Sequence, residues 1–305
     1  MRYLIFCNFS TRLCLKYPWK VLWSFILVGL CLAGCTHVFG EEESGKPVRV
    51  SFLDVGQGLS VLFSGEGGFA LFDTGPDSLG VVDTLLARGV DTLEWVLVSH
   101  YHRDHAGGFM EFPAAIASGR LHVRRLYVGP DMLQGFIRDS VLRVAQRFGI
   151  PVDTIYRGSA VAQVGEDSLN LSVLWPPKRL SLSENAASVV LEVSNGKGSI
   201  LLAADLDSAG ERQLLELSPT LSANVLQVPH HGSKSSNSLA FLAQVQPEYA
   251  VVSVGEGNSY GHPAPSVMRK LFYVTKDSAS VFRTDKDGSV EFELVNGVGV
   301  ILDNL

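Results

Sequence analysis

Three histidines and one aspartate lie within six residues of a single apolar segment. The run WVLV at 95–98 is followed by His100, His102, Asp104 and His105. Imidazole nitrogens and carboxylate oxygens are the donors that borderline divalent metals such as zinc prefer, and a tight loop turns this spacing toward one cavity. Two glycines directly after the cluster permit a close turn from the loop into a helix. The cluster therefore predicts a metal site, because a solvated polar loop would rarely gather three of the chain's eight histidines.

Cysteine chemistry is excluded from the part of the chain that carries this cluster. All four cysteines, Cys7, Cys14, Cys31 and Cys35, lie in the first 35 of the 305 positions. The rest of the chain can form no disulfide framework, thiolate metal site or cysteine nucleophile. Its chemistry must therefore use histidine, carboxylate, hydroxyl or backbone groups.

The N-terminus has the pattern of an export signal. Positions 1–40 contain four basic residues and no acidic residue, and the apolar run at 21–33 is shorter than the ~20 residues of a bilayer-spanning helix. The sequence LAGC at 32–35 resembles the lipobox of bacterial lipoproteins, in which the signal is cut before the cysteine and the cysteine is acylated. We expect a signal peptide at 1–34, a lipidated Cys35, and an exported protein anchored in a membrane and facing the periplasm or the cell exterior. An uncleaved anchor, or a plain signal with a chance cysteine, is the alternative.

Charge limits the partners of the exported part. Residues 35–47 read as a short polar tether, and residues 48–305 as one domain. Without positions 1–34 the chain has 21 Lys and Arg against 31 Asp and Glu, a formal net charge of −10. Such a charge opposes general attraction to phosphate backbones, so a nucleic-acid role would need a local basic patch. No protein partner is indicated.

Short β-rich runs alternate with helical patterns from Val48 onward, which predicts an α/β domain with helices outside its sheets. The first three runs are joined by Gly-rich turns and read as antiparallel neighbours. Phe282 to Gly288 reads as a late hairpin turn. Helices are expected at about 79–89, 132–148 and 208–217.

The pattern HxHxDH after a strand resembles the signature of the metallo-β-lactamase superfamily. Asp73 in FDTG, Asp205 at the end of ILLAAD and the late histidine in VPHHGS follow in the order of that superfamily. In the superfamily the early aspartate supports the metal ligands and the later one bridges the metals. The resemblance implies an αββα sandwich, in which two mixed β-sheets are flanked by helices.

Three further motifs resemble the soluble hydrolase-like domain of the ComEC family of competence proteins. They are FLDVGQG at 52–58, VPHHGSKSS at 228–236 and NSYGHP at 258–263. ComEC proteins also contain a multi-spanning channel, and we expect this chain to be a stand-alone copy of the C-terminal hydrolase-like domain without it. Because the family domain is proposed to be a nuclease, the resemblance implies hydrolysis of a phosphodiester, including single-stranded DNA, by metal-activated water.

Carried over residue by residue, the resemblance gives two metal positions for Zn²⁺ or Mn²⁺, occupied by one or two ions. The first would use His100 and His102, the second Asp104, His105 and a late histidine, and Asp205 would bridge them. Either His230 or His231 could be the late ligand; His230 is favoured because it follows the strand directly. His231 would then act on the substrate or support the ligands.

This sequence departs from the wider superfamily in one place. Typical members have a third histidine between the HxHxDH motif and the bridging aspartate, but the only histidine in that interval is His122, which comes too early and reads as a surface residue. Asn185 and Ser188 stand near the expected place. Amide or hydroxyl oxygens there would make manganese more plausible than in a three-histidine site.

The remaining predicted roles belong to catalysis and substrate binding. The residues expected to act in catalysis are Asp104, Asp205, His231 and His262, and those expected to hold the substrate are Asn185, Ser188, Ser233, Lys234 and Ser235. Two alternatives stay open: a hydrolase of another ester or amide, including a β-lactam, and a non-catalytic, metal-stabilised, lipid-anchored binding protein.

Overall fold

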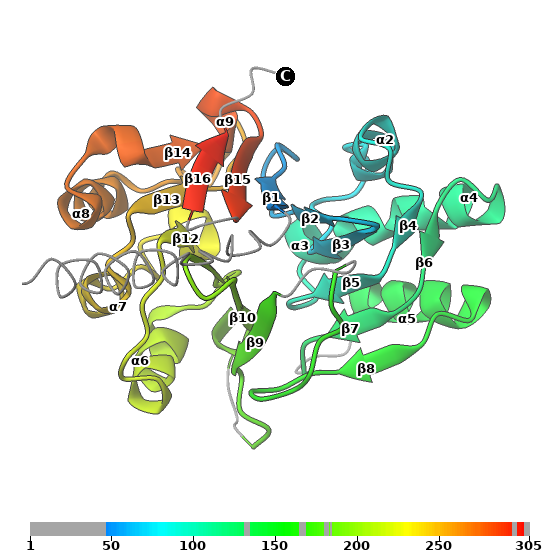
Figure 1. Cartoon of the computed structure of the whole chain (residues 1–305), viewed down its shortest axis with the longest axis horizontal. Coiled ribbons are helices and arrows are strands. Elements are labelled where there is room, and N and C mark those ends of the chain that lie inside the picture. Colours follow the sequence, from blue (N-terminus) through cyan, green and yellow to red (C-terminus); the bar gives the residue numbers. More distant parts are fainter. Residues whose placement is uncertain are drawn as a thin grey trace, which may run out of the picture. The chain divides into compact units, whose positions relative to one another are not determined.

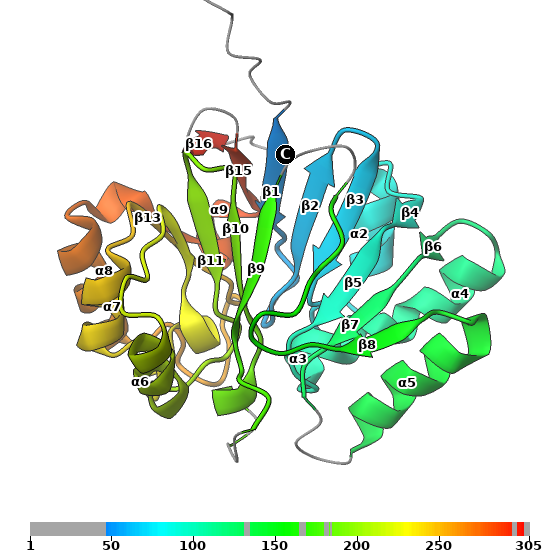
Figure 2. The same cartoon turned by 60° about the horizontal axis from the view of Figure 1, so that its bottom comes forward.

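Two facing β-sheets form the centre of the domain, and helices cover the outer face of each (Figures 1 and 2). The computed structural model describes residues 47–130, 135–164, 169–179, 183, 185–294 and 298–301. The expected signal peptide at 1–34, the lipidated Cys35 and the tether up to residue 46 lie outside the described residues. Within the described part, no helix has the length and apolar character needed to cross a membrane.

The first sheet has eight strands in the order β16-β15-β1-β2-β3-β5-β7-β8. Strands β1, β2 and β3 are antiparallel neighbours, as predicted, and β3, β5, β7 and β8 run parallel. The strand bounds are β1 Val48–Phe52, β2 Val61–Gly65, β3 Gly68–Phe72, β5 Trp95–Val98, β7 Leu126–Val128, β8 Val152–Thr154, β15 Val290–Leu294 and β16 Val298–Ile301.

The second sheet has six strands in the order β14-β13-β12-β11-β10-β9. Strands β11 to β14 are parallel, whereas β9, β10 and β11 are antiparallel. The strand bounds are β9 Asn170–Trp175, β10 Val190–Ser194, β11 Ser199–Leu202, β12 Val225–Gln227, β13 Tyr249–Val252 and β14 Val281–Arg283. A small parallel pair, β4 (Thr92–Leu93) and β6 (His122–Val123), accompanies the two large sheets.

Three apolar clusters correspond to the three interfaces between layers. Fully buried Phe52 and Trp95 from the first sheet pack in one cluster with Leu191 and Ile200 from the second. The other two clusters join each sheet to its own helices. Because both faces of each sheet are covered, the strands read as nearly continuous apolar runs rather than alternating ones. This arrangement is the expected αββα sandwich.

The helices divide between the two outer faces (Figure 2). The first sheet carries α2 (Val81–Ala87), α3 (Arg103–Ala106), α4 (Phe112–Ala117) and α5 (Phe136–Phe148); the second carries α6 (Ser208–Leu217), α7 (Leu239–Val245) and α8 (Pro265–Thr275). The helices α2, α5 and α6 confirm the three predicted ones.

The prediction of a hairpin turn at 282–288 is wrong. Strand β14 belongs to the second sheet and β15 to the first, with α9 (Thr284–Asp287) between them. The segment therefore carries the chain from one sheet to the other. Arg283 donates two hydrogen bonds to the carboxylate of Asp285 in this connection.

Candidate metal centre

The residues of the HxHxDH motif and of its distant partners all follow the carboxyl ends of strands. The motif follows β5, Asp205 follows β11, and His230 and His231 form the short 3-10 turn η3 (Pro229–Gly232) after β12. Strands β11 and β12 are parallel neighbours, so their carboxyl ends meet at one edge of the second sheet. This topology brings Asp205 next to His230 and His231, and the HxHxDH motif, which follows β5 of the facing sheet, meets them there.

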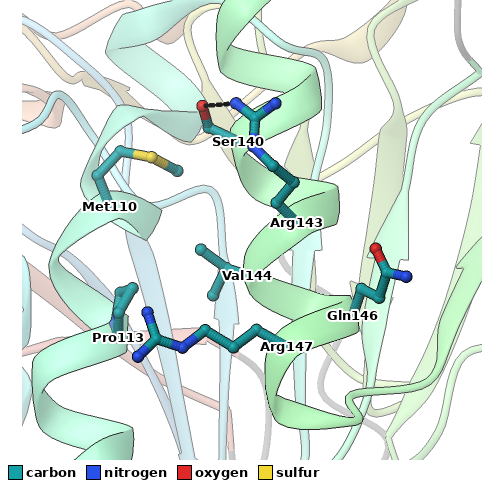
Figure 3. Close-up of a pocket in the computed structure, with 7 residues that line it drawn as sticks. All are labelled: Met110, Pro113, Ser140, Arg143, Val144, Gln146 and Arg147. Carbon is teal, nitrogen blue, oxygen red and sulfur yellow. Dashed lines mark hydrogen bonds between the residues drawn. The ribbon is translucent and has the colours of Figure 1, made fainter.

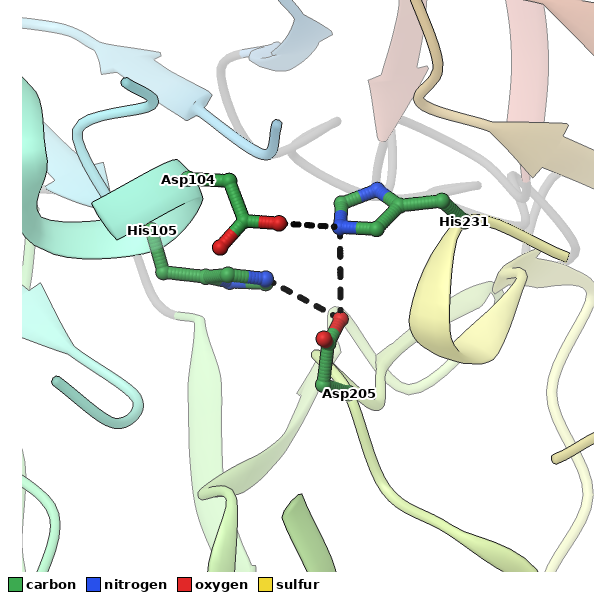
Figure 4. Close-up of side chains that lie close together, drawn as sticks. All are labelled: Asp104, His105, Asp205 and His231. Atoms are coloured by element: carbon green, nitrogen blue, oxygen red, sulfur yellow. Dashed lines mark ion pairs between the residues drawn. The ribbon is translucent and has the colours of Figure 1, made fainter. Parts of the chain in front are cut away.

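Four of these side chains form one cluster (Figure 4). The Nε2 atom of His105 lies 3.0 Å from Oδ1 of Asp205, and Nε2 of His231 lies 3.5 Å from the same oxygen. His231 Nε2 is also 3.3 Å from Oδ2 of Asp104. One donor atom from each of the four residues lies within 4.8 Å of all the others, which is compatible with a single bound ion.

A second cluster shares Asp205 with the first. One donor atom each of His100, His102 and Asp205 lies within 4.8 Å of the other two. His100 Nε2 is 4.0 Å from Oδ2 of Asp205, whereas the first cluster faces Oδ1. The two oxygens of one carboxylate thus face two groups of imidazoles.

The geometry points away from the sequence-based preference for His230 as the late ligand. His231 is buried and belongs to the four-residue cluster, whereas His230 does not. His230 approaches Asp205 from the other oxygen, with Nε2 at 3.5 Å from Oδ2. Both histidines have a left-handed backbone, with φ near 52°, so sequence order along the turn does not decide which ring points inward.

The donor atoms that face the cluster fit a cation. The Nε2 atoms of His100, His105 and His231 and Oδ1 of Asp205 are buried and have no hydrogen-bond partner outside the cluster; within it, Nε2 of His105 lies 3.0 Å from Oδ1 of Asp205. A buried polar atom without a full hydrogen bond costs roughly 1–3 kcal/mol, so donor atoms gathered at one place in this way need an explanation. A divalent metal with nitrogen and oxygen ligands supplies that explanation.

Asp73 orients one histidine of each ligand cluster on the side of the ring away from the cluster, which is the supporting role expected from the sequence. Its Oδ2 lies 2.7 Å from Nδ1 of His105 and accepts a hydrogen bond of 2.7 Å from the Ser99 hydroxyl. Because that hydroxyl gives its only proton to Asp73, its contact of 3.1 Å with Nδ1 of His100 makes the imidazole the donor. One buried carboxylate therefore turns Nε2 of both histidines toward the cluster.

Backbone groups fix the remaining histidine. The Nδ1 of His231 lies 2.8 Å from the carbonyl oxygen of Ser253, which can only accept, so Nδ1 carries the proton and Nε2 faces the cluster. The turn itself is held by Asn237, whose amide donates to the carbonyls of Pro229 and Ser233 at 2.9 and 3.1 Å.

Charge within the cluster shifts its pKa values in the directions that a cation site requires. Burial alone would lower the pKa of His105, but the carboxylates of Asp205 and Asp73 outweigh it and raise that pKa well above its usual range. Burial alone would raise the pKa of Asp205, but His105 and His231 hold it well below its usual range. The site thus favours a positive charge between its carboxylates, and a metal would replace the proton.

Four of the predicted substrate-binding residues are placed by contacts with their neighbours or by burial. Asn185, in the 3-10 turn η2 (Asn185–Ala187), has its Nδ2 3.4 Å from Nδ1 of His230, and Ser188 is buried with an unpartnered hydroxyl. Ser233 and Ser235 share a hydrogen bond of 2.9 Å.

Two more of the predicted residues flank the HHGS turn. The ring of His262 lies 5.8 Å from that of His230 and 6.5 Å from that of His231, between centroids. Lys234 is exposed to solvent, and its assignment to substrate stays a prediction.

The FLDVGQG motif packs against the backbone of the metal cluster. Leu59 N–H donates to the carbonyl of Asp104 at 3.0 Å, and a Cβ on Gly58 would lie 2.4 Å from that oxygen. The Oε1 of Gln57 accepts from the N–H of Gly255 at 3.2 Å. The motif therefore holds two loops of the site together, which explains its residue types.

A separate hollow lies between α5 and the segment formed by η1 (Gly107–Glu111) and α4 (Figure 3), with a volume of about 480 Å³. Arg143 and Arg147 line it one helical turn apart, and neither has a carboxylate within ion-pair distance among the described residues. None of the candidate ligands lines this hollow, so it is distinct from the metal centre.

A family comparison agrees with the architecture. The profile of the metallo-beta-lactamase superfamily matches residues 53–256. The chain belongs to the metallo-beta-lactamase superfamily. Of the solved structures, the metallo-beta-lactamase fold protein YhfI from Bacillus subtilis aligns over 81% of this chain and 99% of its own, with a TM-score of 0.53 at 13% identity. At that identity the likeness concerns the fold alone.

Within this superfamily the chain is similar to competence proteins. ComE operon protein 3 of Bacillus subtilis (strain 168) is 32% identical over 291 residues, which cover 89% of this chain and 36% of that protein. Competence protein ComA of Neisseria gonorrhoeae is 33% identical over 285 residues, covering 92% and 36%. The chain therefore spans about a third of the length of these relatives.

Several supporting residues were missed in the sequence. Ser99 directly precedes His100, and that adjacency was the available signal for its contact with Asp73. Ser253 and Asn237 act through a backbone carbonyl and through a turn, and no local pattern marks such contacts. His122, read as a surface residue, is exposed in β6.

Proposed function

We propose that this superfamily member is a metal-dependent phosphodiesterase that acts on DNA or another phosphodiester. The observation that carries the proposal is the convergence on one carboxylate of three buried imidazole nitrogens without a hydrogen-bond partner outside the cluster, with the two carboxylate oxygens facing two ligand groups. Relatedness to competence proteins supports a nucleic-acid substrate.

The ligands divide into two positions for Zn²⁺ or Mn²⁺. Asp104, His105 and His231 would hold one ion and His100 and His102 the other, with Asp205 shared by the two groups. A divalent metal at such a position supplies Lewis acidity toward a phosphoryl oxygen and activates water at neutral pH. Of the two histidines that the sequence left open as the late ligand, the proposal takes His231, which belongs to the four-residue cluster, rather than the favoured His230.

The chain's other polar groups act on the substrate. Asp104 and Asp205 orient the attacking water through their carboxylate oxygens. His262, whose buried Nδ1 has no hydrogen-bond partner, donates a hydrogen bond to the phosphate. His230, which lies beside His262, and Asn185, which contacts His230, would border the bound phosphate. The other predicted substrate contacts are Ser188, Ser233, Lys234 and Ser235.

The place of the protein in the cell is part of the proposal. Cleavage before Cys35 and acylation of that cysteine would anchor the domain in a membrane and expose it outside the cytoplasm. Intact-mass measurement of the purified protein tests this step, because lipidated Cys35 at the N-terminus gives a mass that neither the full chain nor an unmodified product has.

Hydrolysis assays test the activity. Protein loaded with Mn²⁺ or Zn²⁺ should hydrolyse bis-p-nitrophenyl phosphate and single-stranded DNA, and the double variant Asp104→Ala, His105→Ala should fall to background. His122→Ala is the matched control, because it removes an exposed histidine outside both clusters. Full activity in the double variant would refute the proposal.

The same preparations separate the alternatives. Turnover of nitrocefin or of a thioester, without cleavage of phosphodiesters, would indicate a hydrolase of another ester or amide. A pure protein that binds no metal and stays inactive after reconstitution would indicate a binding protein.

A further inference from the structure

An exposed tyrosine stands beside the candidate centre. Tyr260, in the NSYGHP motif, is 69% exposed although its ring is large and apolar. Its ring lies 5.7 Å from that of His262 between centroids, and the two planes differ by only 22°. One side of the tyrosine ring thus faces a histidine while most of its surface faces solvent.

The loop that carries Tyr260 is held by hydrogen bonds to a single side chain. Asn258 donates from Nδ2 to the carbonyls of Gly255 and His262 at 3.0 and 2.7 Å, and its Oδ1 accepts from the N–H of His262 at 3.0 Å. Three bonds close the loop around the tyrosine. A ring fixed in this way loses less conformational entropy when a ligand stacks on it.

Near-parallel rings lead from the metal ligands to this tyrosine. His231 belongs to the four-residue cluster, and its ring is 6.5 Å from that of His262 with planes 24° apart. Tyr260 continues the series outward. A group attached to a phosphate at the cluster would therefore pass His262 and meet the tyrosine ring.

The negative charge of the chain favours stacking over electrostatic attraction as the contact between Tyr260 and a nucleic acid. The chain has a formal net charge of −6, and Glu256 is exposed in the same loop, so general electrostatic attraction of a polyanion is weak here. Stacking between a base and an aromatic ring needs no such attraction, and proteins use it to bind single strands without sequence preference.

We propose that Tyr260 is a stacking platform for one nucleobase of a single-stranded nucleic acid whose phosphate lies at the metal cluster. The proposal rests on the phosphodiesterase function and names its preferred substrate class: unpaired nucleotides, which are bound more tightly than small phosphodiesters without a base, although both are hydrolysed. Stacking on the tyrosine positions the strand and takes no part in bond breaking.

The test compares Tyr260→Ala, Tyr260→Phe and Tyr273→Ala. Tyr273 on α8 is the matched control, because it is a tyrosine of similar exposure, 74%, without a ring contact among the described residues. The substrates are a short single-stranded oligodeoxynucleotide and the same backbone with abasic sites throughout. A phosphorothioate-linked oligonucleotide that carries one 2-aminopurine reports stacking by the quenching of its fluorescence on binding to the metal-loaded protein.

Tyr260→Ala should raise KM for the base-containing strand about 5- to 150-fold at nearly unchanged kcat, the range expected for the loss of one stacked base. KM for the abasic strand should stay within about twofold, because no base stacks there. Tyr260→Phe and Tyr273→Ala should behave as wild type, and only Tyr260→Ala should lose quenching.

The outcomes separate this inference from the function on which it rests. Hydrolysis with the same KM and quenching in Tyr260→Ala as in wild type would overturn the platform and leave the phosphodiesterase standing. Quenching that depends on Tyr260 in a protein that hydrolyses no phosphodiester would support the platform and overturn the phosphodiesterase. Absence of both hydrolysis and quenching in wild type would overturn both.

Discussion

Asp73→Asn tests how the metal ligands are oriented, because Asp73 lies outside both ligand clusters but contacts His105 directly and His100 through the Ser99 hydroxyl. The carboxylate accepts from Ser99 N–H and from Ser99 Oγ, both at 2.7 Å, and contacts Nδ1 of His105 at 2.7 Å. An amide has one acceptor oxygen where the carboxylate has two. In the variant, a donor of the amide must therefore face a donor of either Ser99 or His105.

The expected loss follows from these contacts. If the His105 ring changes tautomer to relieve the clash, Nε2 carries the proton and no longer offers a lone pair to a metal. Removal of such a supporting partner typically costs about 10- to 100-fold in metal affinity, which corresponds to about 1.4–2.8 kcal/mol at 1.4 kcal/mol per tenfold. We expect a loss within this range.

Competition with a chelating dye at neutral pH measures the change in Kd for Zn²⁺ or Mn²⁺. Asp77→Asn is the matched control: Asp77 lies in the same loop but pairs with Arg103 at the surface, so its replacement should leave Kd within about twofold. Wild-type affinity in Asp73→Asn, with the fold intact by circular dichroism, would refute the reasoning.

Three further predictions concern stability. Gly129→Ala should lower the free energy of unfolding in urea by about 1–3 kcal/mol, because its Cβ would lie 2.2 Å from the carbonyl oxygen of Ser99. Gly135→Ala meets open space and exchanges only the N-cap glycine of α5, so it should cost less than this; equal stability of the two variants would contradict the prediction. Removing the metal with a chelator should lower Tm by about 5–10 °C relative to protein with free metal at 100 times its Kd, a concentration at which binding stabilises the fold by about 2.7 kcal/mol. Calorimetry that finds the same Tm with and without the metal would show that the folded protein does not bind the ion. Burial raises the pKa of the Glu211 carboxyl above its ordinary 4.5, although hydrogen bonds to the carboxylate act to lower it. The contribution of Glu211 to the free energy of unfolding is therefore fully present below pH 4.5 and is lost as the pH rises through the pKa of the folded state. Glu211→Gln should remove that part of the pH dependence, so urea titrations above about pH 4.5 should show wild type losing stability relative to the variant. If the free energy of unfolding changed with pH in the same way in both proteins, the predicted direction would be contradicted.

Local spacing was enough to predict that the side chains of the HxHxDH motif lie close together. The HxHxDH residues share one loop and one short helix after β5, so their proximity follows from the chain itself. Asp205 and the HHGS turn were linked to them by the order of motifs. The parallel strands β11 and β12 explain why Asp205 lies beside that turn, and the facing of the two sheets brings both to the HxHxDH motif.

The inward-facing histidine of the HHGS turn was not predictable in the same way. His230 follows the strand more closely, but the left-handed backbone at both His230 and His231 turns the later ring into the cluster. That conformation depends on long-range bonds from Asn237 and to Ser253, which no neighbouring residue specifies. The helices α7 and α8 were missed for a similar reason, because their short apolar stripes gain meaning only against the sheet.

The most direct test of the two-position centre is an anomalous scattering map of crystals loaded with Mn²⁺ or Zn²⁺. We expect a peak among Asp104, His105, Asp205 and His231, with any second peak between Asp205 and the pair His100 and His102. A metal bound only elsewhere, or a peak that is held by His230 while His231 stays uncoordinated, would contradict this centre.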